Sequence, residues 1–343
     1  MKPLVSIIVP CYNEEATIHL LLEAIYQQTY PLQRIEVIIA DGLSSDGTRQ
    51  VIRSFQDEYA DIAVQIVDNP KRNIPSGLNQ AIEAASGTII VRLDGHSSPA
   101  CDYVERCVKA LEEERGDNVG GIWRIRAGGD GILADAIALA ASHPLAAGDA
   151  RYRIGGKAQQ VDTVPFGAFR REVINRIGKF DESLLTNEDY EFNVRLRQSG
   201  GKVWFDPAIQ SVYYARPDLA SLARQYWRYG YWKMHMLRRH PGSLRWRQAL
   251  PPLFVMVLLG LAFLSLWGMI PRLLLVAQLS LYIIVLIIAG IQIAWKKRRL
   301  GLVWSLPLAI ATMQLSWGSA FLWGLARSLV GHFFSPKARH ATD

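Results

Sequence analysis

The sequence predicts a large α/β domain followed by helices that span a membrane, and two patterns indicate this fold class. Short β-branched runs alternate with helical stretches in the N-terminal part of the 343 residues, while charged residues almost disappear from the C-terminal part. Half of the residues are hydrophobic and a fifth are charged, a balance that excludes a disordered chain. The length excludes a mini-protein and allows a sizeable core.

Four β-branched runs are predicted to be buried strands because turn residues bound each of them. These runs cover residues 5–9, 36–40, 63–67 and 88–93. Apolar residues at helical spacing predict three helices between the strands. These helices cover residues 16–28, 48–59 and 76–85. The alternation predicts a parallel sheet with helices on both faces and a ligand site at the carboxyl ends of its strands.

After residue 118 the pattern becomes irregular, and we expect residues 118–214 to close over a second substrate. Residues 219–239 are predicted to form an amphipathic helix rich in Trp, Tyr and Arg, a composition typical of the membrane interface. We therefore divide the chain into a cytosolic catalytic domain, an interface region, a membrane domain and a tail. Their expected bounds are 1–217, 218–248, 249–330 and 331–343.

Three apolar stretches near the C-terminus are long enough to cross a bilayer, since a crossing takes about 20 residues. They cover about residues 251–270, 273–295 and 302–326. Arg272 is the only charged residue between residues 248 and 295, and residues 300–326 carry no charge. The third stretch contains Pro307, so a crossing, a re-entrant segment and an interfacial helix all stay open for it.

The formal net charge of +7 reflects basic residues that flank the apolar stretches. Lys296, Lys297, Arg298 and Arg299 follow the second stretch, whereas the turn before that stretch carries only Arg272. By the positive-inside rule, this asymmetry places the N-terminal region and the basic run in the cytoplasm. An anionic membrane surface, rather than nucleic acid, is the expected partner of these charges.

Polar side chains follow the first two predicted strands at the point where each strand ends. Pro10, Tyr12 and Glu14 follow the first strand, and Asp41 opens a loop of Gly, Ser and Asp after the second. Each loop alone is also explained as a turn with a helix cap. On adjacent strands, however, an aromatic face and an Asp acceptor can hold a planar base by stacking and by a hydrogen bond.

Asp94 and His96 stand two residues apart at the end of the fourth predicted strand. A carboxylate and an imidazole at this spacing can converge on Mg²⁺ or Mn²⁺, which would neutralise a diphosphate leaving group. A capping Asp beside a surface His is the alternative explanation.

Two later clusters have both a functional and a structural explanation. Glu188 and Asp189 begin a helical stretch, where the helix dipole favours acids, but Asp189 would act as a general base if it faces the cleft. Gln225, Arg228 and Tyr229 share one face of the predicted amphipathic helix. They fit an aromatic belt, and they equally fit a diphosphate contact from Arg228 and a sugar contact from Tyr229.

Six stretches in a fixed order resemble those of the inverting, GT-A fold glycosyltransferases of family 2, and within them the bacterial succinoglycan-type exopolysaccharide glucosyltransferases. The resemblance spans about residues 4–250. The stretches are residues 9–15 (VPCYNEE), 41–48 (DGLSSDGT), 77–79 (GLN), 92–96 (RLDGH), 166–168 (FGA) and 180–189 (FDESLLTNED).

The resemblance implies a UDP-sugar site at the carboxyl edge of the sheet. The residues implied to bind uracil and ribose are Pro10, Tyr12, Glu14 and Asp41. Further contacts to the donor are implied for Arg72, Asn79, Asp94 and Arg228. Asp94 and His96 stand where the family has its Asp-x-Asp motif for Mg²⁺ or Mn²⁺, and His96 departs from that pattern.

The resemblance also implies a base and an acceptor site. Asp189 would be the general base, with Glu188 supporting it. The residues implied to contact the acceptor are Phe166, Gly167, Ala168, Gln225 and Tyr229. Gln225, Arg228 and Tyr229 are similar to the Gln-x-x-Arg-Trp motif of processive synthases, with Tyr in place of Trp.

The activity implied is transfer of a sugar, first of all glucose, from a UDP-sugar to a hydroxyl of a polyprenyl-diphosphate-linked glycan, with inversion. We expect a multi-pass enzyme of a bacterial-type cytoplasmic membrane, with its catalytic domain facing the cytoplasm and other glycan-assembly proteins as further partners. A processive polysaccharide synthase, a polyprenyl-phosphate glycosyltransferase and a membrane-tethered scaffold without catalysis are the alternatives.

Overall fold

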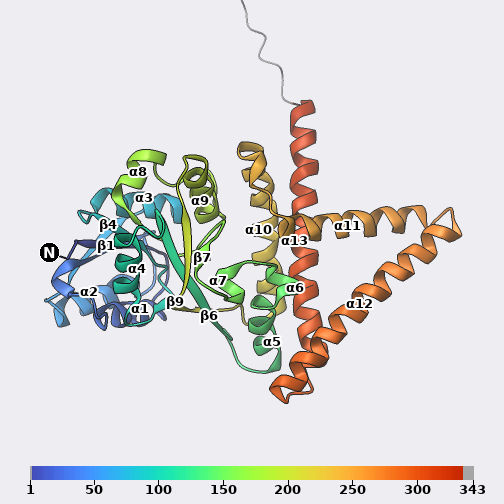
Figure 1. Ribbon diagram of the computed structural model, residues 1–343, viewed down its shortest axis with the longest axis horizontal. Coiled ribbons are helices and arrows are strands. Elements are labelled where there is room, and N and C mark those ends of the chain that lie inside the picture. Colours follow the sequence, from blue (N-terminus) through green and yellow to red (C-terminus); the bar gives the residue numbers. More distant parts are fainter. Residues whose placement is uncertain (1, 335–343) are drawn as a thin grey trace, which may run out of the picture. The chain divides into compact units, whose positions relative to one another are not determined.

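The computed structural model describes residues 2–334, so the expected tail of 331–343 lies outside the described residues from residue 335 onward. The chain folds into two units, Met1–Pro217 and Asp218–Asp343. Figure 1 shows strands and helices in the first unit and helices in the second.

The first unit is built, in the described residues, on a nine-stranded sheet with the order β3-β2-β1-β4-β8-β6-β9-β5, and β7 pairs with β9. The first four strands in this order run parallel to one another, which confirms the parallel sheet predicted from the alternation. Their bounds are β1 (Val5–Cys11), β2 (Ile35–Asp41), β3 (Ala63–Asp68) and β4 (Ile89–Arg92).

Helices cover both faces of this sheet, as predicted. Side chains of β1 alternate between the faces, so that Ile7 packs with α1, α2 and α4, whereas Ile8 packs with α3, α8 and α9. Both faces of the parallel part are therefore buried, which explains its nearly continuous apolar runs. The bounds of these helices are α1 (Ile18–Tyr26), α2 (Thr48–Glu58), α3 (Ile74–Ala84), α4 (Tyr103–Glu112), α8 (Arg171–Ile177) and α9 (Glu188–Gln198).

The stretch of 118–214 that looks irregular in the sequence supplies the other half of the sheet. Strands β6 (Asn118–Arg126) and β9 (Val203–Tyr214) pair in parallel along most of their length, with a register shift between Gly120 and Ile122. The glycines of β6 and Pro207 within β9 interrupt the sequence pattern that would reveal a strand. The short strands are β5 (Ser98–Pro99), β7 (Gln159–Gln160) and β8 (Ala168–Arg170). The short helices are η1 (Leu32–Arg34), α5 (Ile132–Ala141), α6 (Pro144–Ala147) and α7 (Arg151–Ile154).

In the second unit, three helices pack against one long helix. α13 (Leu302–Phe334) contacts α10 (Leu219–Arg239), α11 (Trp246–Leu264) and α12 (Met269–Lys297). The Trp317 indole N–H donates to the Gln248 carbonyl over 3.1 Å, and the Tyr282 hydroxyl donates to Gln314 Oε1 over 2.8 Å. A 3-10 turn, η2 (Pro241–Ser243), separates α10 from α11.

The helix bounds of the second unit differ from those expected. α11 begins at Trp246, where Gln248 Oε1 accepts from the Arg245 N–H over 3.2 Å, and it contains Pro251 within its body. The expected bounds mark the apolar stretch that is long enough to cross a bilayer, which starts later than the helix itself. Likewise, α13 stays helical through Pro307 to Phe334, because its packing against three helices outweighs one lost backbone hydrogen bond.

Among the described helices, α11 and α12 are the two that are long and apolar enough to cross a membrane, with mean hydropathies of 1.7 and 2.6. Their large apolar side chains are mostly exposed; Ile270 and Phe263 are examples. Contiguous apolar surface of this kind marks a membrane or protein contact.

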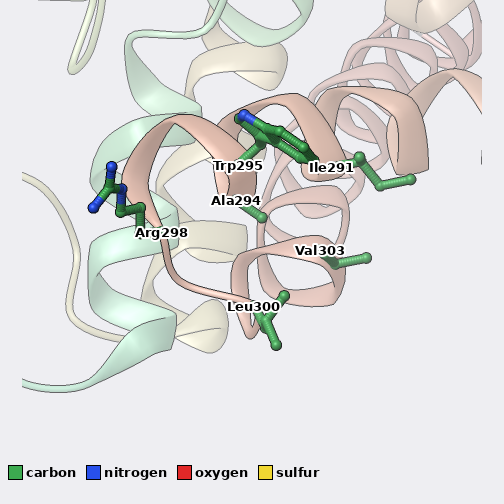
Figure 2. Close-up of a pocket in the computed structure, with 6 residues that line it drawn as sticks. All are labelled: Ile291, Ala294, Trp295, Arg298, Leu300 and Val303. Carbon is green, nitrogen blue, oxygen red and sulfur yellow. The ribbon is translucent and has the colours of Figure 1, made fainter.

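A surface pocket of about 460 Å³ lies at the turn between α12 and α13. Figure 2 shows its six lining residues, Ile291, Ala294, Trp295, Arg298, Leu300 and Val303. Arg298 ends α12 in a left-handed conformation with φ of 54°. The pocket therefore combines apolar walls with one residue of the basic run.

The register shift in β6 gives a test of the sheet. A Cβ added at Gly121 would lie 1.7 Å from the Ile209 carbonyl oxygen, which is backbone and cannot rotate away. We expect Gly121→Ala to lower the free energy of unfolding by about 3 kcal/mol through overpacking. Thermal unfolding of the detergent-solubilised protein would show a Tm lower by about 5–10 °C.

Gly242→Ala is the control, because nothing lies within 4 Å of a Cβ at Gly242. An unchanged Tm for Gly121→Ala would contradict the pairing of β6 with β9.

Candidate active site

Hydrogen bonds join the loops that follow β1 and β2 at the carboxyl edge of the sheet. The Asn13 N–H donates to Ser44 Oγ over 2.8 Å, and Asn13 Oδ1 accepts from the Ser45 N–H over 2.9 Å. The Glu14 N–H donates to Thr48 Oγ1 over 2.8 Å. The two loops therefore form one continuous surface beside the strand ends.

Tyr12 and Arg72 lie together on this surface. The Tyr12 ring is 45% exposed, and the Arg72 guanidinium carbon lies 5.9 Å from the ring centroid, within cation–π range. Pro10 is half-buried on β1 and is in register with Ala40 of β2. The structure thus brings together an exposed aromatic face and a positive charge, which suit a base and a phosphate respectively.

Asp41 lies beneath the surface rather than on it. Its side chain is fully buried and accepts hydrogen bonds from the Ser44 N–H (3.0 Å) and from Arg49 Nε (2.5 Å). Arg49 also pairs with Asp68 at the end of β3. In this structure Asp41 therefore organises the loop, whereas the sequence assigns it a direct contact with the base.

Asn79 is also engaged inside the protein. Its Nδ2 donates to the Phe180 carbonyl and to Glu182 Oε1, each over 2.9 Å, and its Oδ1 accepts from the Phe180 N–H over 3.0 Å. Lys71 pairs with the same Glu182 over 2.6 Å. The structure thus gives Asn79 the task of holding the segment before α9 against α3.

Arg92 is the centre of the site. It lies at the end of β4, is 2% exposed, and its guanidinium contacts three carboxylates. Nη2 lies 3.0 Å from Asp94 Oδ1 and 3.0 Å from Glu188 Oε1, and Nη1 pairs with Asp189. Strand β4 and the first turn of α9, far apart in the sequence, therefore meet at one side chain.

The Asp189 side chain is mostly buried but can still be reached from solvent, since it is 22% exposed. Burial raises the pKa of Asp189 to about 7; the charge of Arg92 acts to lower it, and those of Glu188 and Asp94 act to raise it. A carboxylate with such a pKa can accept a proton near neutral pH.

His96 is turned toward Glu14. Its Nδ1 lies 3.0 Å from Glu14 Oε1, and this hydrogen bond raises the pKa of His96. Burial acts to raise the pKa of Glu14, but its hydrogen bonds with His96 and Thr17 outweigh burial and lower it. Glu14 thus orients His96, and a carboxylate on one ring nitrogen is the usual partner of a metal-binding imidazole.

The described residues contain no group of three or more His, Cys, Asp and Glu side chains placed to hold a metal ion. A metal shared with a diphosphate needs fewer protein ligands, because phosphate oxygens and water complete its shell. When all three carboxylates are ionised, the Arg92 cluster carries two negative charges, which one divalent cation would balance. Asp94, with His96 beside it, fits such an ion.

Phe166, Gly167 and Ala168 are buried and form the floor under Arg92. The Phe166 ring centroid lies 5.8 Å from the Arg92 guanidinium carbon, and the Gly167 carbonyl accepts from the Arg92 N–H over 3.0 Å. A Cβ at Gly167 would lie 2.2 Å from Asn118 Oδ1. Phe166 and Gly167 thus contact Arg92, and the acceptor contacts that the sequence assigns to these three residues stay a prediction.

The other expected site residues belong to the second unit. Arg228 is exposed on α10, and Gln225 Nε2 donates to the Tyr229 hydroxyl over 3.0 Å. Tyr226, on the same helix, stacks edge-on with Tyr229 at 5.6 Å between ring centroids. These contacts order one face of α10.

The role of Arg92 was not predicted from the sequence, although this residue belongs to the RLDGH stretch of residues 92–96. Arg92 ends β4 and Asp94 follows two residues later, so their closeness in the sequence was the available signal. The roles of Arg49 and Glu182 were not predicted either, because their partners become visible only when the loops are folded together.

Comparison with known proteins agrees with this geometry. The model of glycosyl transferase family 2 matches residues 6–178. The succinoglycan biosynthesis protein ExoA of Rhizobium meliloti (strain 1021) is 32% identical over 247 residues, which cover 71% of this chain and 73% of that protein. A Methanococcus voltae enzyme named dolichyl N-acetyl-alpha-D-glucosaminyl phosphate 3-beta-D-2,3-diacetamido-2,3-dideoxy-beta-D-glucuronosyltransferase is 29% identical over 248 residues, covering 71% and 76%.

Solved structures share the fold at lower identity. A mannosyltransferase of Pyrobaculum calidifontis in complex with GDP-Man and Mn²⁺ superposes with a TM-score of 0.65 at 22% identity, covering 95% of this chain and 88% of the other. Residues 1–349 of S. aureus TarS in complex with UDP give a TM-score of 0.50 at 14% identity, covering 94% and 92%. The chain therefore has the GT-A fold and belongs to glycosyl transferase family 2.

Proposed function

We propose that this glycosyltransferase moves a sugar, first of all glucose, from a UDP-sugar to a hydroxyl of a polyprenyl-diphosphate-linked glycan with inversion, in exopolysaccharide or cell-surface glycan assembly. The observation that carries the proposal is the Arg92 cluster. It places Asp94, at the edge where a nucleotide would bind, and Asp189, a base with a pKa of about 7, on one guanidinium.

A single displacement needs a base on one side of the sugar and a means to hold the leaving diphosphate on the other. Asp189 would accept the proton of the attacking hydroxyl, and Glu188 would support it. Asp94 and His96 would hold Mg²⁺ or Mn²⁺. When bound, the ion would neutralise charge on the departing nucleotide diphosphate.

The joined loops after β1 and β2 are proposed to form the surface that binds the nucleotide. Tyr12 would stack on the base, with Pro10 beneath it, and Arg72 would meet a phosphate. Glu14 and Asp41 are proposed to contact the uracil and ribose, and Asn79 the donor, while their own hydrogen bonds hold this surface in shape. Arg228 on α10 is proposed as a further phosphate contact, and Gln225 with Tyr229 as acceptor contacts.

The names of two relatives support the substrate classes. The Rhizobium meliloti relative is named for succinoglycan biosynthesis, and the Methanococcus voltae relative is named as acting on a dolichyl-linked sugar phosphate. A lipid-linked acceptor would also explain the apolar helices α11 and α12. The lipid tail would stay in the bilayer, and these helices would hold the enzyme beside it.

We propose that the chain lies in a bacterial-type cytoplasmic membrane with its catalytic domain in the cytoplasm. The basic run at residues 296–299 and the pocket beside it would face anionic headgroups, with Trp295, 86% exposed, at the interface. The ordered face of α10, with Gln225 bonded to Tyr229, favours a processive synthase as the second candidate function.

The decisive experiment measures transfer of label from UDP-glucose to the lipid fraction of membranes that contain the full chain, with Mn²⁺ or Mg²⁺. One discrete lipid-linked saccharide would support the proposal, whereas a polymer ladder would replace it with the synthase. Label on a bare polyprenyl phosphate would identify a polyprenyl-phosphate glycosyltransferase. If no UDP-sugar gives a product, the proposed donor is wrong.

Asp189→Asn should lower kcat by about 10²- to 10⁴-fold, because an amide cannot accept the proton. The KM for the donor should change little, since Asp189 is proposed to act on the acceptor hydroxyl. Asp130→Asn, in an exposed turn of the same unit, is the matched control and should leave both constants unchanged. Retention of full activity by Asp189→Asn would remove Asp189 from the role of base.

The pKa of Asp189 predicts a pH dependence. Since its pKa is raised to about 7, the proton-accepting form is lost as the pH falls through this value. We expect kcat/KM to fall by about tenfold per pH unit below about pH 7 and to stay level just above it. A profile that is flat from about pH 5.5 to about pH 8 would show that this ionisation does not limit the reaction.

The membrane orientation is testable with single cysteines. Leu266, in the turn between α11 and α12, and Leu300, beside the basic run, are 66% and 86% exposed. In a Cys101→Ser background, an impermeant maleimide added to intact cells should label Leu266→Cys and not Leu300→Cys. The native Cys11 and Cys107 are buried and give little background. The reverse labelling pattern would invert the proposed orientation.

A further inference from the structure

We propose that Arg92 is a positioning residue that fixes the proposed metal ligand Asp94 and the proposed base Asp189 relative to each other. This inference rests on the proposed function and adds to it a residue that acts on both sides of the reaction.

The two terminal nitrogens of the Arg92 guanidinium bind different partners. Nη2 holds Asp94 and Glu188, while Nη1 holds Asp189. A guanidinium is planar and rigid, so carboxylates bound to its two ends keep a fixed separation, which a lysine ammonium cannot impose. Arg92 thus fixes the loop with Asp94, which would hold the donor, relative to the first turn of α9 with Asp189, which would activate the acceptor.

Asp94 keeps capacity for a further ligand. Only Oδ1 of Asp94 meets Arg92, and its side chain is half-buried rather than sealed. The pairing with Arg92 therefore orients the carboxylate and leaves its second oxygen, Oδ2, for a cation. Among the described residues, no hydrogen bond to Oδ2 competes for that position.

The charge of Arg92 sets how strongly the cluster attracts cations. With Arg92 present and its three partners ionised, the cluster carries two negative charges. Without Arg92, the same three carboxylates would face one another in a site of low dielectric. Coulombic attraction for Mn²⁺ would then rise steeply. The positive charge of Arg92 thus limits the Mn²⁺ affinity of the site to that of a single, exchangeable ion. The same charge also offsets the repulsion among the three carboxylates.

A purely structural arginine would behave differently, and the same unit contains one for comparison. Arg171 donates to the backbone carbonyls of Gly87 over 2.8 Å, of Ala85 over 2.6 Å and of Ile82 over 3.4 Å. Loss of Arg171 should lower the free energy of unfolding and leave kcat and Mn²⁺ affinity unchanged. Arg171→Lys is therefore the matched control for Arg92→Lys.

The test compares the full chain with its Arg92→Met, Arg92→Lys and Arg171→Lys variants in detergent. Mn²⁺ affinity is measured by electron paramagnetic resonance without any sugar donor, and Tm, kcat and the KM for the donor are measured alongside. Arg92→Met should bind Mn²⁺ about tenfold more tightly or better, because the cluster loses its positive charge. It should lose about 10²-fold in kcat, because the base and the donor are no longer aligned, with little change in KM.

Arg92→Lys should keep Mn²⁺ affinity near that of the native chain and still lose kcat, since the charge is retained and the fixed fork is not. Arg171→Lys should lower Tm alone. The proposal is overturned if the Arg92 variants lose Mn²⁺ affinity, kcat and Tm together, or if Arg92→Lys is fully active. Because Mn²⁺ binding needs no donor, tighter binding by Arg92→Met with no turnover by the native chain would contradict the proposed function and not the charge role of Arg92.

Discussion

The burial of one guanidinium is the constraint around which the catalytic unit is arranged. A charged group removed from water is stable only when nearby charges and hydrogen bonds replace its hydration, and breaking such a buried pair costs about 3–5 kcal/mol. Arg92 meets this need with Asp94, Glu188 and Asp189. The three carboxylates repel one another and would each resist burial, so the arginine and its acids depend on one another.

The fold supplies both halves of this arrangement from separate elements. Strand β4 ends at Arg92 and Asp94 lies in the loop that follows, while the neighbouring strand β8 begins just after Phe166 and Gly167, which contact Arg92. Helix α9 delivers the other two acids from its first turn, where the helix dipole favours negative charge. Asn193 of α9 bonds to Asn118 of β6 over 2.7 Å, so the helix cannot shift without disturbing the sheet.

The parallel half of the sheet was predictable because β1, β2 and β4 are buried on both faces and read as continuous apolar runs. Strands β6 and β9 were not, since glycines, arginines and a proline conceal them. Local motifs placed Tyr12, Asp94 and Asp189 at the carboxyl edge of the sheet, but they did not reveal that Asp41 and Asn79 are also buried and hydrogen-bonded to the loops around them. Their partners lie on other elements, and no spacing along the chain encodes such contacts.

A structure of the full chain with UDP and Mn²⁺ would test the account most directly. The account predicts Mn²⁺ bound to Asp94 and the diphosphate, the base stacked on Tyr12, Arg92 still paired with Asp189, and Asp189 facing an open path to the sugar position. Mn²⁺ or UDP bound away from this edge of the sheet, or Asp189 sealed from the donor, would contradict it.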